Sequence, residues 1–270
     1  MTRIGRRSFL GVAGAALAML AVPGCSAGAG RESGKGVEDP EMMARRHAKA
    51  RLAARPEGGT SGTGGPGLEP LRIGSERDGV IYAPVGYRPE RPAPLVVSLH
   101  GANGSARRGL RRLQPLADKH GLVVLAPDSR NRTWDVVLGG YGADVAFLDA
   151  ALALTFSRYS IDPQRIGLEG FSDGASYALG LGLSNGRLFS HVLAFSPGFV
   201  SVVDPEGTPR IFVSHGTADS ILPIDQCSRR IVPELRGEDY EVEYVEFEGD
   251  HEVPAAIASQ GVRWFLGAVS

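Results

Sequence analysis

Cysteine is scarce in this chain of 270 residues, which contains only Cys25 and Cys227. Cys227 therefore has no intrachain disulfide partner if Cys25 is modified. The chain also lacks an excess of charge of either sign, because 29 basic residues oppose 30 acidic ones. Its basic residues form no stripe interleaved with aromatic side chains, so we do not expect nucleic acid as a partner.

A membrane-spanning hydrophobic run is missing at the start of the chain, where one could be suspected. The apolar stretch from Phe9 to Val22 has fourteen residues, fewer than the roughly 20 that a spanning helix needs. A basic start without acids precedes it and small residues follow it, which is the layout of a secretory signal. Arg6 and Arg7 before "SFL" resemble a twin-arginine export signal, whose route carries folded proteins.

The segment "VPGC", residues 22–25, resembles the lipobox of bacterial lipoproteins, in which Cys25 would be acylated and become the new N-terminus. The alternative is ordinary cleavage near "SAGAG", residues 26–30, which would release a soluble protein. We favour the anchor, and assign residues 1–24 to the export signal. The prediction is an exported protein at the periplasmic or extracellular face of the cell envelope, bound to the membrane through lipid on Cys25.

Composition divides the remainder into two parts. Residues 25–70 are rich in Gly, Pro, Ser and charge and predict a disordered tether, because they cannot bury enough apolar surface to order the chain. Residues 71–270 alternate apolar runs with helical periods, which predicts one α/β domain with a mostly parallel sheet and helices on both faces. Neither internal repeats nor heptads occur. Strands are expected at "GVIYAPV" (an antiparallel edge strand), "PLVVSLH", "LVVLAP", "RIGLEG", "HVLAFS", "RIFVSH" and "EVEYVEF", and helices near 107–120, 142–158, 173–185, 225–236 and 254–268.

The segment "GFSDG", residues 170–174, lies between an expected strand and an expected helix. A G-x-S-x-G at such a turn is typical of a nucleophile elbow, in which glycines permit a sharp turn and close packing. Ser172 is then a candidate nucleophile. It could equally be a plain helix N-cap, so the rest of the chain has to decide.

A serine nucleophile needs a base, and His251 is the best placed of six histidines. It follows the last expected strand in "FEGDHEVP", which is where the chain order Ser, acid, His of α/β-hydrolases puts its base. His100 also ends a strand before glycine, and we interpret it as a brace for the loop that follows.

The acid should follow the next-to-last strand, where "RIFVSHGTADSILP" offers Asp219. Asp225 is expected to open the next helix instead. Asp250 is adjacent to His251, so its carboxylate should diverge from the ring, and Asp173 is expected to cap a helix. The oxyanion donors should be two backbone amides, those of Asp173 and Ala102.

Six segments together, "LHGANGS", "APDSRNRTWD", "GFSDGASYAL", "FSPGF", "SHGTADSILPI" and "EGDHEVP", resemble the bacterial phospholipase/carboxylesterase family of α/β-hydrolases, relatives of acyl-protein thioesterases. The resemblance spans about residues 70–270. It implies an α/β-hydrolase fold and a serine esterase with Ser172, Asp219 and His251 as its triad, requiring no metal or organic cofactor.

Only about fourteen residues separate "HVLAFS" from "RIFVSH", so we expect no large lid over the site. In the longest insertion, "DSRNRTWDVVLGGYG", Trp134 and Tyr141 are candidate walls of a substrate pocket. The alternative for Trp134 is that it packs this loop onto the sheet.

The predicted function is hydrolysis of a small-molecule or lipid carboxylic ester through an acyl-enzyme. Two alternatives remain open: a thioesterase, amidase or peptidase with the same triad, and an envelope lipoprotein that keeps the fold as a binding module without turnover. The sequence does not fix the acyl group, the alcohol or the oligomeric state.

Overall fold

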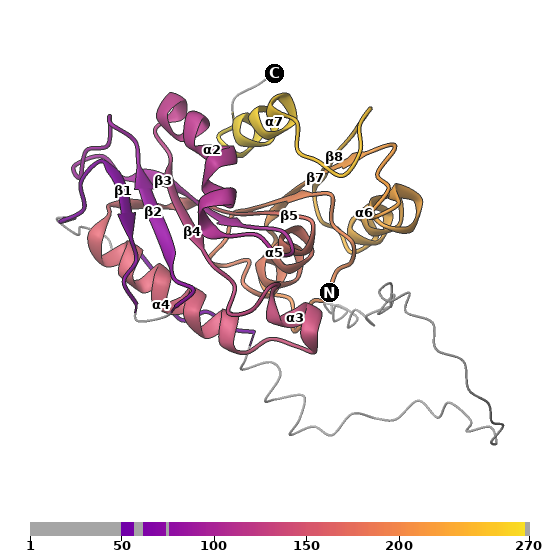
Figure 1. Cartoon of the computed structure of the whole chain (residues 1–270), viewed down its shortest axis with the longest axis horizontal. Helices are drawn as coiled ribbons and strands as arrows, with labels where there is room; N and C mark the ends of the chain where they lie inside the picture. The colour runs from indigo at the N-terminus through magenta and orange to yellow at the C-terminus, as the bar shows by residue number, and fades with distance from the viewer. Residues whose placement is uncertain (1–49, 57–61, 74–75, 268–270) are drawn as a thin grey trace, which may run out of the picture.

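The computed structural model describes residues 50–56, 62–73 and 76–267, and its centre is one eight-stranded sheet (Figure 1). The strands lie in the order β1-β2-β4-β3-β5-β6-β7-β8. The first two are antiparallel to their neighbours and the others are parallel. Their bounds are β1 Gly67–Pro70, β2 Gly79–Ala83, β3 Ala93–Leu99, β4 Val123–Pro127, β5 Ile161–Phe171, β6 His191–Phe195, β7 Arg210–Gly216 and β8 Val242–Phe247.

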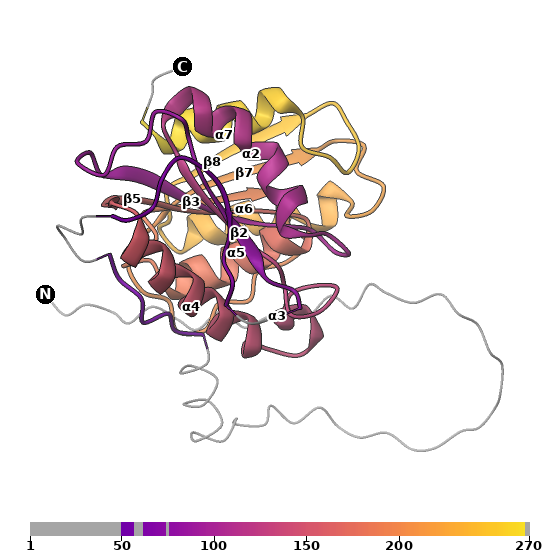
Figure 2. The same cartoon turned by 60° about the vertical axis from the view of Figure 1, so that its left-hand side comes forward.

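Helices cover both faces of this sheet (Figures 1 and 2). The helices α2 (Ala106–His120) and α7 (Ala255–Phe265) pack on one face, where they share a core with β3, β4, β6 and β7. The opposite face carries α4 (Ala143–Arg158), α5 (Asp173–Ser184) and α6 (Ser228–Gly237), together with the short α3 (Asp135–Leu138). The predicted class, a mostly parallel sheet between two helical layers, is confirmed.

The central strands are apolar throughout because both of their faces are buried. Leu95, Val97 and Leu99 of β3 point into the core beneath α4 and α5. Val96, between them, points to the core beneath α2 and α7. None of these four side chains has exposed surface, so continuous apolar runs rather than alternation identify these strands.

One predicted position in the sheet is wrong. The strand "GVIYAPV" was expected at the edge, but β2 pairs with β4 on one side and with β1 on the other. The edge is β1, Gly67–Pro70, which lies inside the segment predicted to be a tether. Composition missed it because a four-residue edge strand with Gly and Pro carries little apolar signal.

Helix α5, which follows Ser172, is buried from Gly174 to Ser184. The segment between β6 and β7, residues 196–209, runs along its outer side without forming a helix of its own. Ser184 Oγ accepts a hydrogen bond from the Val203 amide, and the Glu206 amide donates to Leu183 O. This connection covers α5 and contains no helix, which agrees with the expected lack of a large lid.

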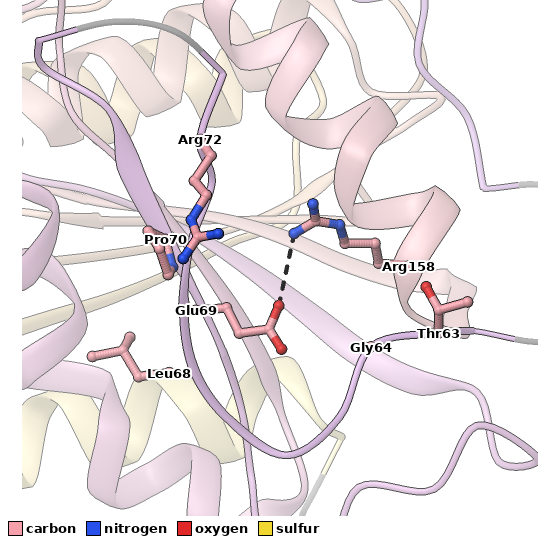
Figure 3. Close-up of a pocket in the computed structure, with 7 residues that line it drawn as sticks. All are labelled: Thr63, Gly64, Leu68, Glu69, Pro70, Arg72 and Arg158. Carbon is pink, nitrogen blue, oxygen red and sulfur yellow. Dashed lines mark ion pairs between the residues drawn. The ribbon is translucent and has the colours of Figure 1, made fainter.

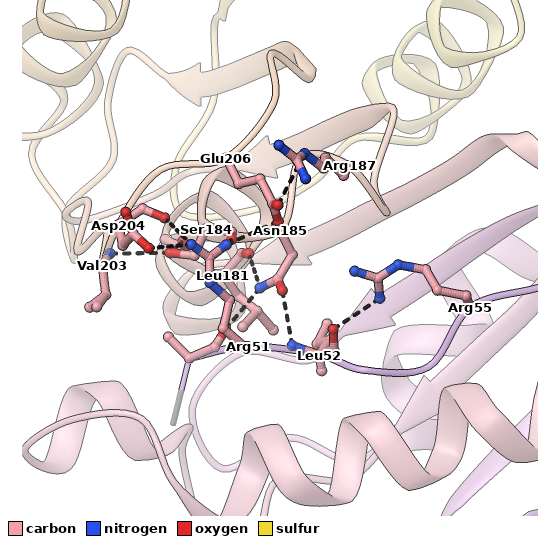
Figure 4. A network of polar contacts seen from close by, with 12 residues as sticks. Arg51, Leu52, Arg55, Leu181, Ser184, Asn185, Arg187, Val203, Asp204 and Glu206 are labelled. Atoms are coloured by element: carbon pink, nitrogen blue, oxygen red, sulfur yellow. Dashed lines mark hydrogen bonds and ion pairs between the residues drawn. The ribbon is translucent and has the colours of Figure 1, made fainter. Parts of the chain in front are cut away.

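A second part of the predicted tether, residues 50–56, is also ordered and packs along α4 and α5; we call it the N-terminal strap (Figure 4). Leu52 is buried, and its amide donates to Asn185 Oδ1. Arg51 contacts the carboxylates of Asp204 and Glu206 and the carbonyl oxygen of Ser184. The prediction failed here because Ala50 and Leu52 reach the core and polar contacts hold the rest of the strap, and so few apolar residues give no signal in a polar segment.

The predicted export signal, residues 1–24, and the predicted lipidation site, Cys25, lie outside the described residues. Among the described helices, none is long and apolar enough to cross a bilayer. Cys227 is buried immediately before α6 and is unbridged.

Candidate active site

Ser172 occupies a sharp turn between β5 and α5. Its backbone has φ 57° and ψ −122°, a conformation that L-residues seldom adopt. The neighbouring glycines make this turn possible, because a Cβ on Gly170 would lie 2.1 Å from Gly174 O and one on Gly174 would lie 2.5 Å from His100 O. Ser172 therefore has a strained backbone conformation, which the close packing of Gly170 and Gly174 maintains, as a nucleophile elbow requires.

His251 lies on the loop between β8 and α7 and reaches Ser172. Its Nε2 is 2.9 Å from Ser172 Oγ. The ring also packs against Phe171, with ring centroids 4.8 Å apart. Phe171 is the residue directly before the nucleophile, and the sequence analysis gave it no role, although its place inside "GFSDG" was a usable signal.

Asp219 lies on the loop after β7, and its side chain has no exposed surface. Its Oδ2 is 2.7 Å from His251 Nδ1. Its Oδ1 accepts hydrogen bonds from the amides of Ile221 and Leu222 at 3.0 and 2.7 Å. A carboxylate accepts, so His251 Nδ1 carries the hydrogen and Nε2 is left free to accept the Ser172 proton.

The other candidate acids have different partners. Asp250 Oδ1 accepts from the amide and hydroxyl of Ser220 and from the His251 amide, so it ties the acid loop to the base loop. Asp225 pairs with Arg229 at 2.9 Å. The sequence analysis set both aside, and the structure brings neither carboxylate to the His251 ring.

The loop after β3 approaches the elbow closely. A Cβ on Gly101 would lie 3.2 Å from Ser172 Cβ. His100 holds this loop, since its Nδ1 lies 2.8 Å from Gly101 O and its Nε2 accepts from the Ser129 amide at 3.0 Å. Burial lowers the pKa of His100, which favours the neutral ring that this pattern requires. Its predicted role as a brace agrees with these contacts.

Two amides are available beside Ser172 for an oxyanion. Asp173 is the first residue of α5, so its amide has no acceptor within the helix. Its carboxylate points elsewhere and accepts from Thr133 Oγ1 at 2.5 Å. Ala102 is exposed on the loop that Gly101 brings to the elbow. Both predicted donors therefore lie on the two elements that meet at Ser172.

Trp134 and Tyr141 do not form the predicted pocket wall. Trp134 has no exposed surface, donates from Nε1 to His100 O at 2.8 Å, and stacks on Tyr177. Tyr141 is buried and donates to Ser201 O. A side chain without accessible surface cannot touch a substrate, so Trp134 has the alternative role of packing its loop onto the sheet.

A hollow of about 560 Å³ lies apart from these residues, beside β1 (Figure 3). Its walls include Arg72, Arg158 and Glu69, and an ion pair of 3.7 Å joins the last two. No residue of the Ser172 site lines it. Within the described parts of the chain, no three His, Cys, Asp or Glu side chains gather closely enough to hold a metal ion.

Solved structures resemble this one over most of the chain. Esterase PE8 superposes with a TM-score of 0.58 at 21% identity and covers 72% of this chain and 99% of its own. A CE1 ferulic acid esterase from Anaeromyces mucronatus, in complex with ferulic acid, has a TM-score of 0.59 at 19% identity over 78% of this chain and 94% of its own. A phospholipase/carboxylesterase from Dyadobacter fermentans has a TM-score of 0.52 at 24% identity, and the match covers 69% of this chain and 95% of its own.

The chain has the α/β-hydrolase fold. This confirms the fold predicted from the ordered motifs, and the neighbours include the phospholipase/carboxylesterase type that those motifs resemble.

Curated relatives match part of the chain. Feruloyl esterase C of Emericella nidulans is 27% identical over 157 residues, which are 55% of this chain and 57% of that protein. A bifunctional acetylxylan esterase/xylanase of Neocallimastix patriciarum is 28% identical over 162 residues, which are 57% of this chain and 23% of that protein. The aligned part thus spans little more than half of the feruloyl esterase and less of the bifunctional enzyme. No protein-family model matches the chain.

Proposed function

We propose that this α/β-hydrolase is a serine carboxylic-ester hydrolase with Ser172, His251 and Asp219 as its triad. The observation that carries the proposal is the unbroken chain of hydrogen bonds from Asp219 Oδ2 through the His251 ring to Ser172 Oγ, at 2.7 and 2.9 Å. This series of hydrogen bonds ends at Ser172, on the strained turn between β5 and α5. The amide of Asp173, the first residue of α5, has no acceptor within the helix. A helix N-cap would need neither the base nor the acid.

The reaction runs in two halves. His251 Nε2 takes the Ser172 proton, Oγ attacks the ester carbonyl carbon, and the amides of Asp173 and Ala102 bind the resulting oxyanion. His251 then protonates the departing alcohol, which leaves an acyl group on Ser172. Water attacks this ester and gives its proton to His251, which returns a proton to Ser172 Oγ as the bond to the acyl group breaks and the carboxylic acid is released. Asp219 holds the ring tautomer and stabilises the imidazolium.

The substrate class we propose to test first is esters of hydroxycinnamic acids. The support is that several curated relatives are named feruloyl esterases and that one solved neighbour holds ferulic acid. Thioester cleavage is the second reaction to test, because an S-formylglutathione hydrolase of Agrobacterium tumefaciens shares the fold with a TM-score of 0.58 at 18% identity.

The test combines labelling with turnover. Wild type, Ser172→Ala and Ser157→Ala are treated with a fluorophosphonate and analysed by intact mass, and Ser157 serves as the control because it is an exposed serine on α4. We expect one label on wild type and on Ser157→Ala, and none on Ser172→Ala. Methyl ferulate, its thioester and its amide then rank the leaving groups. An unlabelled, folded wild type would favour the alternative of a binding module.

Export and anchoring are a separate proposal, supported by residues 1–25 of the sequence alone. We propose that the protein is exported and retained at the cell envelope through lipid on Cys25. Mass spectrometry of the membrane fraction checks this: a lipid-modified N-terminal Cys25 is expected, and an unmodified N-terminus beyond residue 25 would contradict it.

A further inference from the structure

A second histidine contacts the carboxylate of the proposed triad. His215 lies near the end of β7, four residues before Asp219, and its side chain has no exposed surface. Its Nε2 is 3.1 Å from Asp219 Oδ2, the same oxygen that faces His251. In the sequence, His215 stands at the end of "RIFVSH", directly before Gly216. The mechanism above gives this ring no role.

The hydrogen-bond partners assign the tautomer of His215. Nε2 lies 2.8 Å from Leu222 O and 3.1 Å from Asp219 Oδ2, and both atoms are acceptors. Nε2 must therefore carry the hydrogen, which it donates to Leu222 O with Asp219 Oδ2 close beside it. Nδ1 lies 2.6 Å from Ser228 Oγ, so in a neutral ring it accepts from the Ser228 hydroxyl. Burial lowers the pKa of His215 and favours that neutral ring.

Other ionisable groups surround this ring. Asp219 and His251 lie on the side of the proposed triad. Glu246 is opposite His215 in the pairing of β7 with β8, and Arg229 binds its carboxylate. Cys227 precedes α6, and burial raises the pKa of its thiol. Among the described residues, the only carboxylate oxygen within hydrogen-bond reach of His215 is thus the one that also faces His251.

We propose that His215 is a positioning residue for Asp219, an inference that rests on the proposed function. Its Nε2–H donates to Leu222 O, and the same nitrogen lies 3.1 Å from Oδ2. The Leu222 amide in turn binds Oδ1 at 2.7 Å. One ring therefore restrains both oxygens of the carboxylate, one by contact and the other through the turn 219–222. Oδ2 is held toward His251 Nδ1 in the orientation that stabilises an imidazolium.

The consequence is electrostatic as well as geometric. A fixed carboxylate stabilises the imidazolium that forms on His251 during the reaction, whereas one that turns away does not. Loss of the His215 donor should therefore reduce kcat without changing the binding of substrate. A ring that merely filled space would affect stability and leave the kcat of the folded protein unchanged.

The experiment compares His215→Leu, which removes the donor, with His215→Gln, whose side-chain amide can replace Nε2–H. His191→Gln is the control, because His191 is another largely buried histidine and lies at the opposite end of its strand from the site. We expect His215→Leu to lower kcat between about 10- and 100-fold at unchanged KM. His215→Gln should recover most of this loss.

A readout independent of turnover is NMR of ¹⁵N-histidine in the full chain. Wild-type His215 should be neutral with hydrogen on Nε2 at pH 7. Absence of ester turnover in a protein that passes this NMR test would count against the proposed function alone. A charged or Nδ1–H His215, an unchanged kcat in a folded His215→Leu, or a His215→Gln as slow as His215→Leu, would overturn the positioning role.

Discussion

At the scale of single residues, the site depends on glycines, because the backbone of α5 approaches the end of β3 more closely than any side chain would allow. Gly174 is the second residue of the helix after the nucleophile, and an added Cβ would lie 2.5 Å from His100 O and 2.6 Å from Leu99 O. These carbonyl oxygens belong to the strand and loop that carry the proposed oxyanion donor Ala102. Packing of helix against strand at this point therefore also sets the distance between the two amides.

Gly174→Ala is expected to lower the free energy of unfolding by about 1–3 kcal/mol, because an overpacked backbone contact has to open. Catalysis should fall as well, since the elbow and the Ala102 loop would separate. Denaturant titration and ester turnover measure the two effects. Gly237→Ala is the control, because an added Cβ there meets nothing within 4 Å. Equal stability of the two variants would refute this account of the elbow.

The acid offers a second test at this scale. Asp219→Asn should lower kcat by about 10⁴-fold, because an amide nitrogen facing His251 Nδ1 would donate to it and select the wrong tautomer. Asp225→Asn, six residues away and exposed, should retain activity near that of wild type. Steady-state kinetics separates the two, and a large loss in Asp225→Asn with little loss in Asp219→Asn would reverse the assignment.

At the scale of elements, the N-terminal strap joins three separate parts of the chain. Its backbone amides at Ala53 and Ala54 donate to Asp149 Oδ1 on α4, and Asn185 Nδ2 donates to Ala50 O. Arg51 reaches the connection between β6 and β7 (Figure 4). The strap thus links α4, the end of α5 and the segment that covers α5.

Arg51→Ala should cost about 1–3 kcal/mol of unfolding free energy, the range for hydrogen bonds to charged partners. Arg55→Ala is the control from the same strap, because Arg55 donates to the strap's own carbonyls, Leu52 O and Ala54 O. Denaturant titration should therefore separate the two arginine variants. If they are equally stable, the strap does not stabilise the domain through Arg51.

The elements also show which sequence signals are sufficient. The predicted helices agree with α2, α4, α5, α6 and α7 to within a few residues, because each has an apolar face or a buried run that periodicity detects. Helix α3 has four residues and no buried side chain, so no such pattern exists. The strap and β1 depend on pairing with distant segments, which composition within a short window does not report.

At the scale of the whole molecule, a half-buried histidine far from the site makes stability depend on pH. Burial, followed by the charge of Arg210, lowers the pKa of His191 to about 4. In the unfolded chain its pKa is about 6.5. Between these values the unfolded chain binds a proton that the folded protein does not, so the free energy of unfolding falls as the pH falls from 6.5 to 4.

His191→Gln should therefore reduce the pH slope of the unfolding free energy in this window, by up to about 1.4 kcal/mol per pH unit. Guanidinium titrations of wild type and variant at pH 4.5, 5.5 and 6.5 give the two slopes. Other groups contribute equally to both proteins, so the difference isolates His191. Identical slopes would show that this ring does not couple folding to protons.

The three residues of the proposed triad lie far apart in the sequence, but each follows its own strand, and the C-terminal ends of parallel strands meet at one edge. Ser172, Asp219 and His251 could therefore be predicted from the G-x-S-x-G motif and the order of the strands. His215 could not, since its contact with Asp219 depends on how the turn 219–222 folds back. Trp134 could not either, because no sequence pattern distinguishes an aromatic ring beneath a loop from one above it.

The position of the strap has a consequence for how the protein can be held. Asn185, which the strap grips, follows α5 at its far end, and the twelve residues of that helix put it about 18 Å along the axis from Ser172. The described part of the chain therefore begins, at residue 50, near the end of α5 remote from Ser172. A bead or a fusion partner joined at this strap would sit on the side of the domain away from Ser172 and leave the site uncovered.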